Sequence, residues 1–199
     1  MKSSFLRNGA ALLLTLSLAA CGGSSLGGKA QYTIQGTISN LTNSGMVLAS
    51  NGQTVSPAAG DTTFTFPKTI DYGVEFNVLV QTQPNHMTCS VGADGNSSAG
   101  HTIAIDATVA CVQNTYTVGG TISGLSVAGL VLGNGSATTY TPVAADTTFT
   151  MPDVVADGTS YGITVLVQPT GLTCTVANGT GVMGSAAIAN VAVTCVANS

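Results

Sequence analysis

Charged side chains are scarce in this chain of 199 residues. They make up 6% of it, against about 25% of an average soluble protein. Only four residues are basic, Lys2, Arg7, Lys29 and Lys68, and none of those after residue 20 is an arginine. So few cations cannot neutralise a row of phosphates, which excludes nucleic-acid binding. A basic patch that holds anionic lipids is excluded for the same reason.

Tryptophan is absent, and histidine nearly so. Without tryptophan the chain lacks the usual platform for a carbohydrate ring. His86 and His101 are its two histidines, and no Gly-x-Ser-x-Gly elbow accompanies them. We expect both to be solvated loop residues. The sequence therefore predicts a protein that is not an enzyme and that carries no cofactor.

The first 20 residues have the pattern of an export signal. Lys2 and Arg7 precede an apolar run over 10–19 that is too short to span a bilayer comfortably. The run ends in Leu18-Ala19-Ala20-Cys21, which resembles the lipobox of bacterial lipoprotein precursors. The resemblance implies that signal peptidase recognises Leu18, Ala19 and Ala20, and that the Cys21 thiol is lipidated.

Gly22 follows that cysteine, where an aspartate in such lipoproteins favours the inner membrane. The resemblance therefore implies anchoring in the outer membrane, with the membrane as the first partner. Residues 21–31 are rich in glycine and serine and predict a flexible tether. Loss of residues 1–20 leaves two lysines against eight acidic residues, a formal charge of −6.

The rest of the chain is a duplication. Tyr32-Thr-Ile-Gln-Gly-Thr-Ile-Ser returns as Tyr116-Thr-Val-Gly-Gly-Thr-Ile-Ser, and Asp61-Thr-Thr-Phe-Thr returns from Asp146. A period this long indicates a duplicated domain rather than a solenoid unit. We place one copy at 32–112, a linker at 113–115 and the second copy at 116–199. A linker of three residues predicts a fairly rigid rod.

The number of cysteines supports this division. Five is an odd number for an exported chain, and a lipidated Cys21 leaves two in each copy. Four cysteines allow three pairings, of which only Cys89 with Cys111 and Cys174 with Cys195 keeps both bonds within the copies. Closing a loop of this size stabilises a small domain by about 3 kcal/mol. The sequence contains neither a Cys-x-x-Cys motif nor a cysteine–histidine cluster, so it does not favour redox chemistry or a zinc site.

Apolar residues alternate along the chain, as in Phe76, Val78 and Val80, which is typical of strands. In the first copy we expect strands near 32–39, 46–50, 53–57, 62–66, 74–82, 87–92 and 103–112. Four Asn-Gly or Asp-Gly pairs predict hairpins: 51–52, 94–95, 134–135 and 178–179. The sequence thus predicts an all-β protein of two tandem antiparallel sandwiches.

The residues that carry this pattern resemble an immunoglobulin-like or prealbumin-like module. The order Gly-Thr-Ile-Ser, Gly-Leu-Val-Leu, Asp-Thr-Thr-Phe-Thr, then Tyr-Gly-Ile-Thr-Val-Leu-Val is similar to a repeat of uncharacterised bacterial lipoproteins and surface proteins. The resemblance covers both copies and implies the fold, not an activity. Immunoglobulin domains carry a core tryptophan between their cysteines, and this chain has none.

Three other features have an ordinary structural interpretation. Asp94 to Ser98 spaces oxygen ligands like a calcium loop, but it lacks the closing glutamate, so we expect a turn and no metal. Asp61 and Asp146 suit turns that their own carboxylates close. Lys68 follows Pro67 rather than lying on a first strand, which argues against an intramolecular isopeptide bond.

The leading hypothesis from the sequence is a non-enzymatic outer-membrane lipoprotein that acts as a structural or adhesive surface module. The alternative is a lipoprotein that faces the periplasm and binds or inhibits a protein partner, through an edge strand or a loop end.

Overall fold

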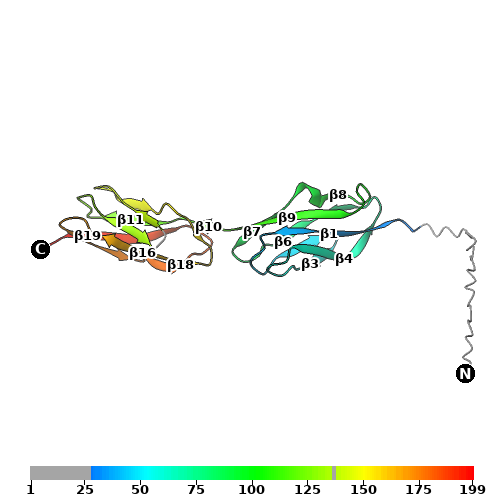
Figure 1. The fold of residues 1–199 in the computed structure, drawn as a ribbon, viewed down its shortest axis with the longest axis horizontal. Helices are drawn as coiled ribbons and strands as arrows, with labels where there is room; N and C mark the ends of the chain where they lie inside the picture. The colour runs from blue at the N-terminus through cyan, green and yellow to red at the C-terminus, as the bar shows by residue number, and fades with distance from the viewer. Residues whose placement is uncertain (1–27, 136–137) are drawn as a thin grey trace, which may run out of the picture.

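The computed structural model describes residues 28–135 and 138–199. This part of the chain is built from strands and turns, and its one helical element is a single 3-10 turn, η1 (Ala93–Gly95). The strands form two sandwiches that follow each other along the long axis of the molecule (Figure 1). No helix in the described residues is both long and apolar enough to cross a membrane. The all-β, tandem-sandwich prediction is confirmed.

The first sandwich contains three sheets, with strand orders β4-β1-β9-β7, β3-β2-β6 and β5-β8. Its strands are β1 (Gln31–Ser39), β2 (Val47–Ser50), β3 (Gln53–Val55), β4 (Thr63–Asp71), β5 (Glu75–Asn77), β6 (Leu79–Thr82), β7 (Met87–Val91), β8 (Asn96–Ser98) and β9 (Ile105–Gln113).

The second sandwich repeats this plan with the orders β14-β11-β19-β17, β13-β12-β16-β18 and β10-β15. Its strands are β10 (Thr115–Tyr116), β11 (Val118–Ser123), β12 (Val131–Asn134), β13 (Thr138–Tyr140), β14 (Thr148–Thr150), β15 (Val155–Ala156), β16 (Ser160–Val167), β17 (Leu172–Ala177), β18 (Thr180–Val182) and β19 (Ile188–Ala197). β9 reaches Gln113 and β10 begins at Thr115, so Asn114 alone separates the strands of the two copies.

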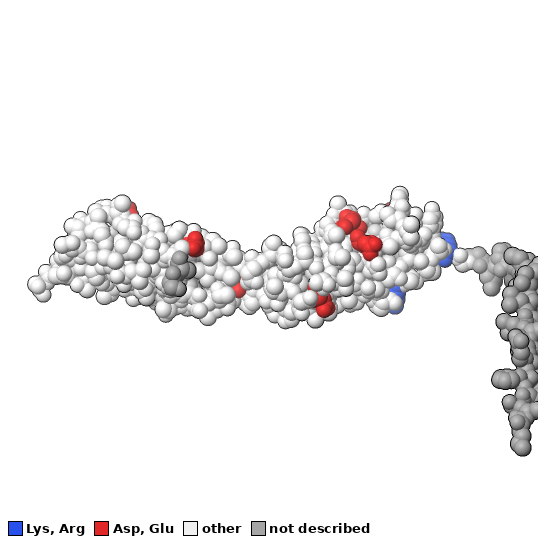
Figure 2. Space-filling view, viewed as in Figure 1, with Lys and Arg blue, Asp and Glu red and all other residues white. Residues whose placement is uncertain are grey.

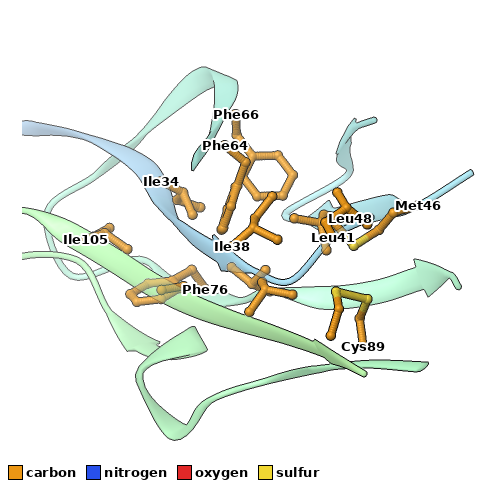
Figure 3. Packing of buried hydrophobic residues seen from close by; sticks show 14 of the residues in the cluster. Ile34, Ile38, Leu41, Met46, Leu48, Phe64, Phe66, Phe76, Cys89 and Ile105 are labelled. Atoms are coloured by element: carbon orange, nitrogen blue, oxygen red, sulfur yellow. A yellow bond between two sulfur atoms is a disulfide. The ribbon is translucent and has the colours of Figure 1, made fainter. Parts of the chain in front are cut away.

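Strand alternation builds the cores. On β1, Ile34 and Ile38 are buried while the residues between them, apart from Gly36, face outward. They meet Phe64 and Phe66 of β4, whose rings pack edge to face with centroids 5.8 Å apart (Figure 3). A second apolar cluster, from Val118 to Cys195, fills the other sandwich. Each copy therefore has its own core.

One strand pairing in each copy runs parallel, a feature that an antiparallel expectation does not include. β1 pairs with β9 in parallel from Ile34 opposite Ile105 to Ser39 opposite Ala110. β11 and β19 pair in the same way. Gly36 and Gly120 lie within these pairings, where a Cβ would come 1.9 and 1.8 Å from the carbonyl oxygens of Ala107 and Val191. The main chains approach too closely there for any side chain.

The single strand expected over 74–82 is in fact two. β5 pairs with β8, a short strand that the sequence pattern did not indicate, and β6 pairs with β2. Between them the Val78 amide donates to the carbonyl of Gly95. The chain therefore crosses from one sheet to another at Val78, although its apolar alternation is unbroken.

Two of the four predicted hairpins are correct. Asn51-Gly52 joins β2 to β3, and Asn134-Gly135 lies at the end of β12, whose antiparallel neighbour β13 is the next strand of the chain. The predictions at 94–95 and 178–179 are wrong. Asp94-Gly95 lies in η1 between β7 and β8, and Asn178-Gly179 lies between β17 and β18, and neither pair of strands is hydrogen-bonded. These turns carry the chain between sheets.

Candidate functional site

The two predicted disulfides are present in the structure. Cys89 of β7 lies directly opposite Cys111 of β9, with their Cα atoms 4.0 Å apart. Cys174 of β17 and Cys195 of β19 repeat this at 3.9 Å. All four side chains are buried, as the alternation around them predicts. Each bond joins the last strand of its copy to a neighbouring strand.

A glutamine side chain holds the backbone of one cysteine in each copy. The Gln83 amide donates from Nε2 to the Cys89 carbonyl at 3.0 Å, and its Oε1 accepts from the Cys89 N–H at 2.7 Å. Gln168 makes the same two bonds to Cys174, at 2.9 and 2.7 Å. These amides use the outward donor and acceptor of β7 and β17 at the cysteine. At these two positions the backbone groups of the edge strands β7 and β17 are therefore not free to pair with an added strand.

The two copies are bonded to each other beside Asn114. His86, in the loop before β7, places Nδ1 2.9 Å from Oδ1 of Asp157, in the turn after β15. The backbone N–H of Asn114 donates to the backbone carbonyl of His86 at 3.0 Å. The backbone N–H of Asp157 donates to the backbone carbonyl of Asn114 at 2.9 Å. Gln113 Nε2 donates to the Asp157 carbonyl at 3.0 Å. We call these four residues the junction.

The junction corrects the expectation that His86 is a solvated loop residue. Half of its side chain is covered, and the Asp157 side chain is only 8% exposed. His86 also adopts a left-handed backbone, with φ of 60°, a conformation that costs energy for a side-chain-bearing residue. In this conformation the imidazole meets the carboxylate of Asp157 in the other copy.

Comparison of the two copies shows that neither residue of this pair is repeated at the equivalent position of the other copy. The loop that holds His86 in the first copy has Gly171 in the second, also with positive φ. The turn that holds Asp157 in the second copy has Tyr72 in the first, and each precedes a glycine of positive φ. Of these four equivalent positions, only the two that face each other across the junction hold a histidine and an aspartate.

His101 lies elsewhere, in an exposed loop of the first copy. It lines an open groove of about 780 Å³ together with Asp94 and Asp106. Asp94 Oδ1 already accepts from the backbone N–H of Thr108 at 3.1 Å and from its hydroxyl at 3.0 Å. Within the described ranges no three His, Cys, Asp or Glu side chains gather in a way that could hold a metal.

The other predicted site residues divide into two groups. Asp61 and Asp146 close turns as expected, since Oδ2 of each accepts from a backbone N–H three residues earlier at 2.8 Å. Leu18, Ala19, Ala20 and Cys21 lie outside the described residues.

Charge is sparse on the molecule. The face in Figure 2 is almost entirely uncharged, with a few acidic side chains, and basic ones only toward the end of the first sandwich where the tether joins it. Together, the fold and the contacts define a tandem β-sandwich protein in which each sandwich has one cystine between neighbouring strands and the junction joins the two.

Comparisons with known proteins add little to this description. The chain matches no family model, and no curated protein matches it. Among solved structures, it is similar to the major pilin protein T-13 of Streptococcus pyogenes at 10% identity and a TM-score of 0.33. That match covers 84% of this chain and 97% of the pilin. It is also similar to the shaft pilin SpaA of Lactobacillus rhamnosus GG, at 10% identity and a TM-score of 0.26, covering 85% and 100%. Likeness at this level carries no inference about function.

Proposed function

We propose that this protein is a non-enzymatic lipoprotein of the outer membrane that holds a rod of two sandwiches at the cell surface, as a structural or adhesive module. The observation that carries the proposal is the junction. It joins the copies end to end with side-chain and main-chain bonds rather than by a loose linker. A rod with its tether at one end is suited to displaying its far end away from a membrane.

Two sequence features support the location. The Leu18-Ala19-Ala20-Cys21 motif provides the anchor, and residues 22–30 provide a spacer of up to about 30 Å. Two or three acyl chains on Cys21 bind a bilayer far more firmly than one, because each buried CH₂ contributes about 0.8 kcal/mol. The sparse charge of the described surface supports a structural role more than electrostatic recognition of a ligand.

Brief trypsin treatment of intact cells tests the proposal. Beyond residue 20 trypsin has two sites, Lys29 in the tether and Lys68 in β4. Lys68 is protected, because the Gln53 side chain binds both its backbone N–H, at 2.8 Å, and its carbonyl, at 3.1 Å. A surface rod is therefore released as one fragment that begins at Ala30. Lys29→Gln should abolish release, and Lys68→Gln should leave it unchanged.

A protein that trypsin cuts only after the outer membrane is permeabilised is not a surface module. That result favours the alternative, a partner-binding lipoprotein in the periplasm. The edge that we assign to such a partner is β18, which among the described strands pairs with β16 alone and on which Val182 is 66% exposed. Incorporation of labelled palmitate into the wild-type chain, and its loss in Cys21→Ser, tests the anchor separately.

A further inference from the structure

The chain enters and leaves each sandwich on two strands that lie side by side. In the first copy the tether leads into β1, and the chain departs toward the second copy from the end of β9. β1 and β9 are hydrogen-bonded neighbours that run in the same direction over six registered pairs. Both follow the long axis of the molecule (Figure 1). A pull on the two ends therefore draws these strands past each other along their lengths.

The second copy has the same arrangement. The short strand β10 and then β11 follow the junction, and β19 is the last described strand. β11 and β19 are parallel neighbours over five registered pairs from Val118 to Ser123. Both sandwiches therefore meet an end-to-end pull in the same geometry, in series, with Asn114 between them.

This geometry decides how the hydrogen bonds share a force. Each bond contributes only about 1 kcal/mol to stability, and bonds that are opened one at a time offer little resistance. Sliding one strand along a parallel neighbour loads all the bonds between them together. From the registers of β1/β9 and β11/β19 we infer that this protein bears tension between its tether and its far end, with the parallel pairs as the elements that resist it.

The cystines extend the resisting element. Cys111 lies near the exit of β9 and is covalently joined to Cys89 of β7, so β9 cannot slide without taking β7 with it. Cys195 ties β19 to β17 in the same way. The residues between each pair of cysteines also stay closed when the rest of a sandwich is pulled open.

Single-molecule pulling tests this inference on the whole exported chain from Cys21 onward. One handle is attached to the Cys21 thiol and the other to a cysteine added after Ser199, with both native cystines formed. For comparison, the second handle is attached through Val74→Cys. Val74 lies just beyond β4, whose last residue, Asp71, pairs with Gln31 at the start of β1. A pull between Cys21 and residue 74 therefore peels β1 from β4 pair by pair.

At equal loading rates we expect the end-to-end pull to unfold the sandwiches at roughly two- to threefold higher force than the peeling pull unfolds the first copy, because forced unfolding reports the unfolding rate along the loaded direction. Equal or lower force in the end-to-end direction overturns the inference. The comparison uses the same fold loaded in two directions, so a folding defect cannot produce the difference. Circular dichroism of Val74→Cys checks that it folds.

A second readout tests the part assigned to the cystines. Reduction should lengthen each end-to-end unfolding step by about 70 Å, since an extended residue spans at most ~3.6 Å and the cysteines are 22 and 21 residues apart. Steps of unchanged length show that the cystines are not in the loaded path. The inference rests on the proposed surface role for its biological meaning, but the two fail separately. Trypsin treatment decides the location, and the force ratio decides the mechanics.

Discussion

His86 of the first sandwich lies 2.9 Å from Asp157 of the second, nitrogen to oxygen, and the two residues are 71 positions apart in the chain. A carboxylate only accepts, so the imidazole donates from Nδ1. The contact brings a half-exposed side chain against one that is almost fully buried. Since the equivalent positions in the other copy hold Gly171 and Tyr72, the pair fixes this one boundary.

Replacing the histidine should loosen the rod without unfolding it. We expect His86→Ala to leave both cores intact but to let the sandwiches reorient, because the side-chain bond between His86 and Asp157, worth about 1 kcal/mol, is lost from the junction. Backbone ¹⁵N relaxation measures this as shorter rotational correlation times for both copies. His101→Ala, which changes the exposed loop histidine, is the matched control and should leave the correlation times unchanged. Correlation times that respond equally to both substitutions would contradict this role.

The parallel strand pairs should not tolerate a side chain at their closest approach. Gly36→Ala should lower the free energy of unfolding of the first sandwich by about 3 kcal/mol or more, since the Cβ meets a carbonyl oxygen that cannot move alone. Gly120→Ala should do the same in the second. Gly162→Ala is the control: a Cβ there meets nothing within 4 Å, so we expect a change within about 0.5 kcal/mol. Chemical denaturation measures all three.

Gln83, which holds the Cys89 backbone, should contribute more to the stability of the first sandwich than the nearby Gln81. Gln83→Ala removes both side-chain bonds to the Cys89 backbone, so we expect a loss of about 1–3 kcal/mol of stability. Gln81→Ala changes an exposed glutamine of β6 and should be almost neutral. Thermal unfolding followed by circular dichroism compares them, and equal effects would show that the Cys89 contacts do not contribute.

Each cystine should stabilise its own copy. Replacing Cys89 and Cys111 together by serine should lower the stability of the first sandwich by about 3 kcal/mol, because the unfolded chain gains freedom. The second sandwich has a separate core and should unfold as before. Calorimetry should then resolve two transitions, of which only one has moved. A shift of both by the same amount would indicate a single cooperative unit.

Much of this fold could be predicted from the sequence because it depends on local alternation and on repetition. The two copies and the cysteine pairs follow from the repetition, and the aspartate turns at Asp61 and Asp146 follow from short local patterns. Turn chemistry alone does not say which strands pair. Asp94-Gly95 and Asn178-Gly179 have the residues of hairpin turns, yet they lead from one sheet to another. The parallel pairings β1/β9 and β11/β19 join segments too distant for any local pattern to reveal.

The junction was missed for a similar reason, although a signal was available. Aligning the copies places His86 against Gly171 and Asp157 against Tyr72. A charged or titratable residue that departs from its repeat at each side of a short linker indicates a contact between the copies. Viewed as a lone loop histidine, His86 gave no such indication.

Residual dipolar couplings of the exported chain with Cys21→Ser measure whether the two sandwiches form one rod. A rod held at the junction predicts that a single alignment tensor fits the backbone couplings of residues 32–112 and 116–197 together. Two tensors of different magnitude, one for each copy, would mean that the sandwiches reorient independently and that the junction does not hold them as a rod.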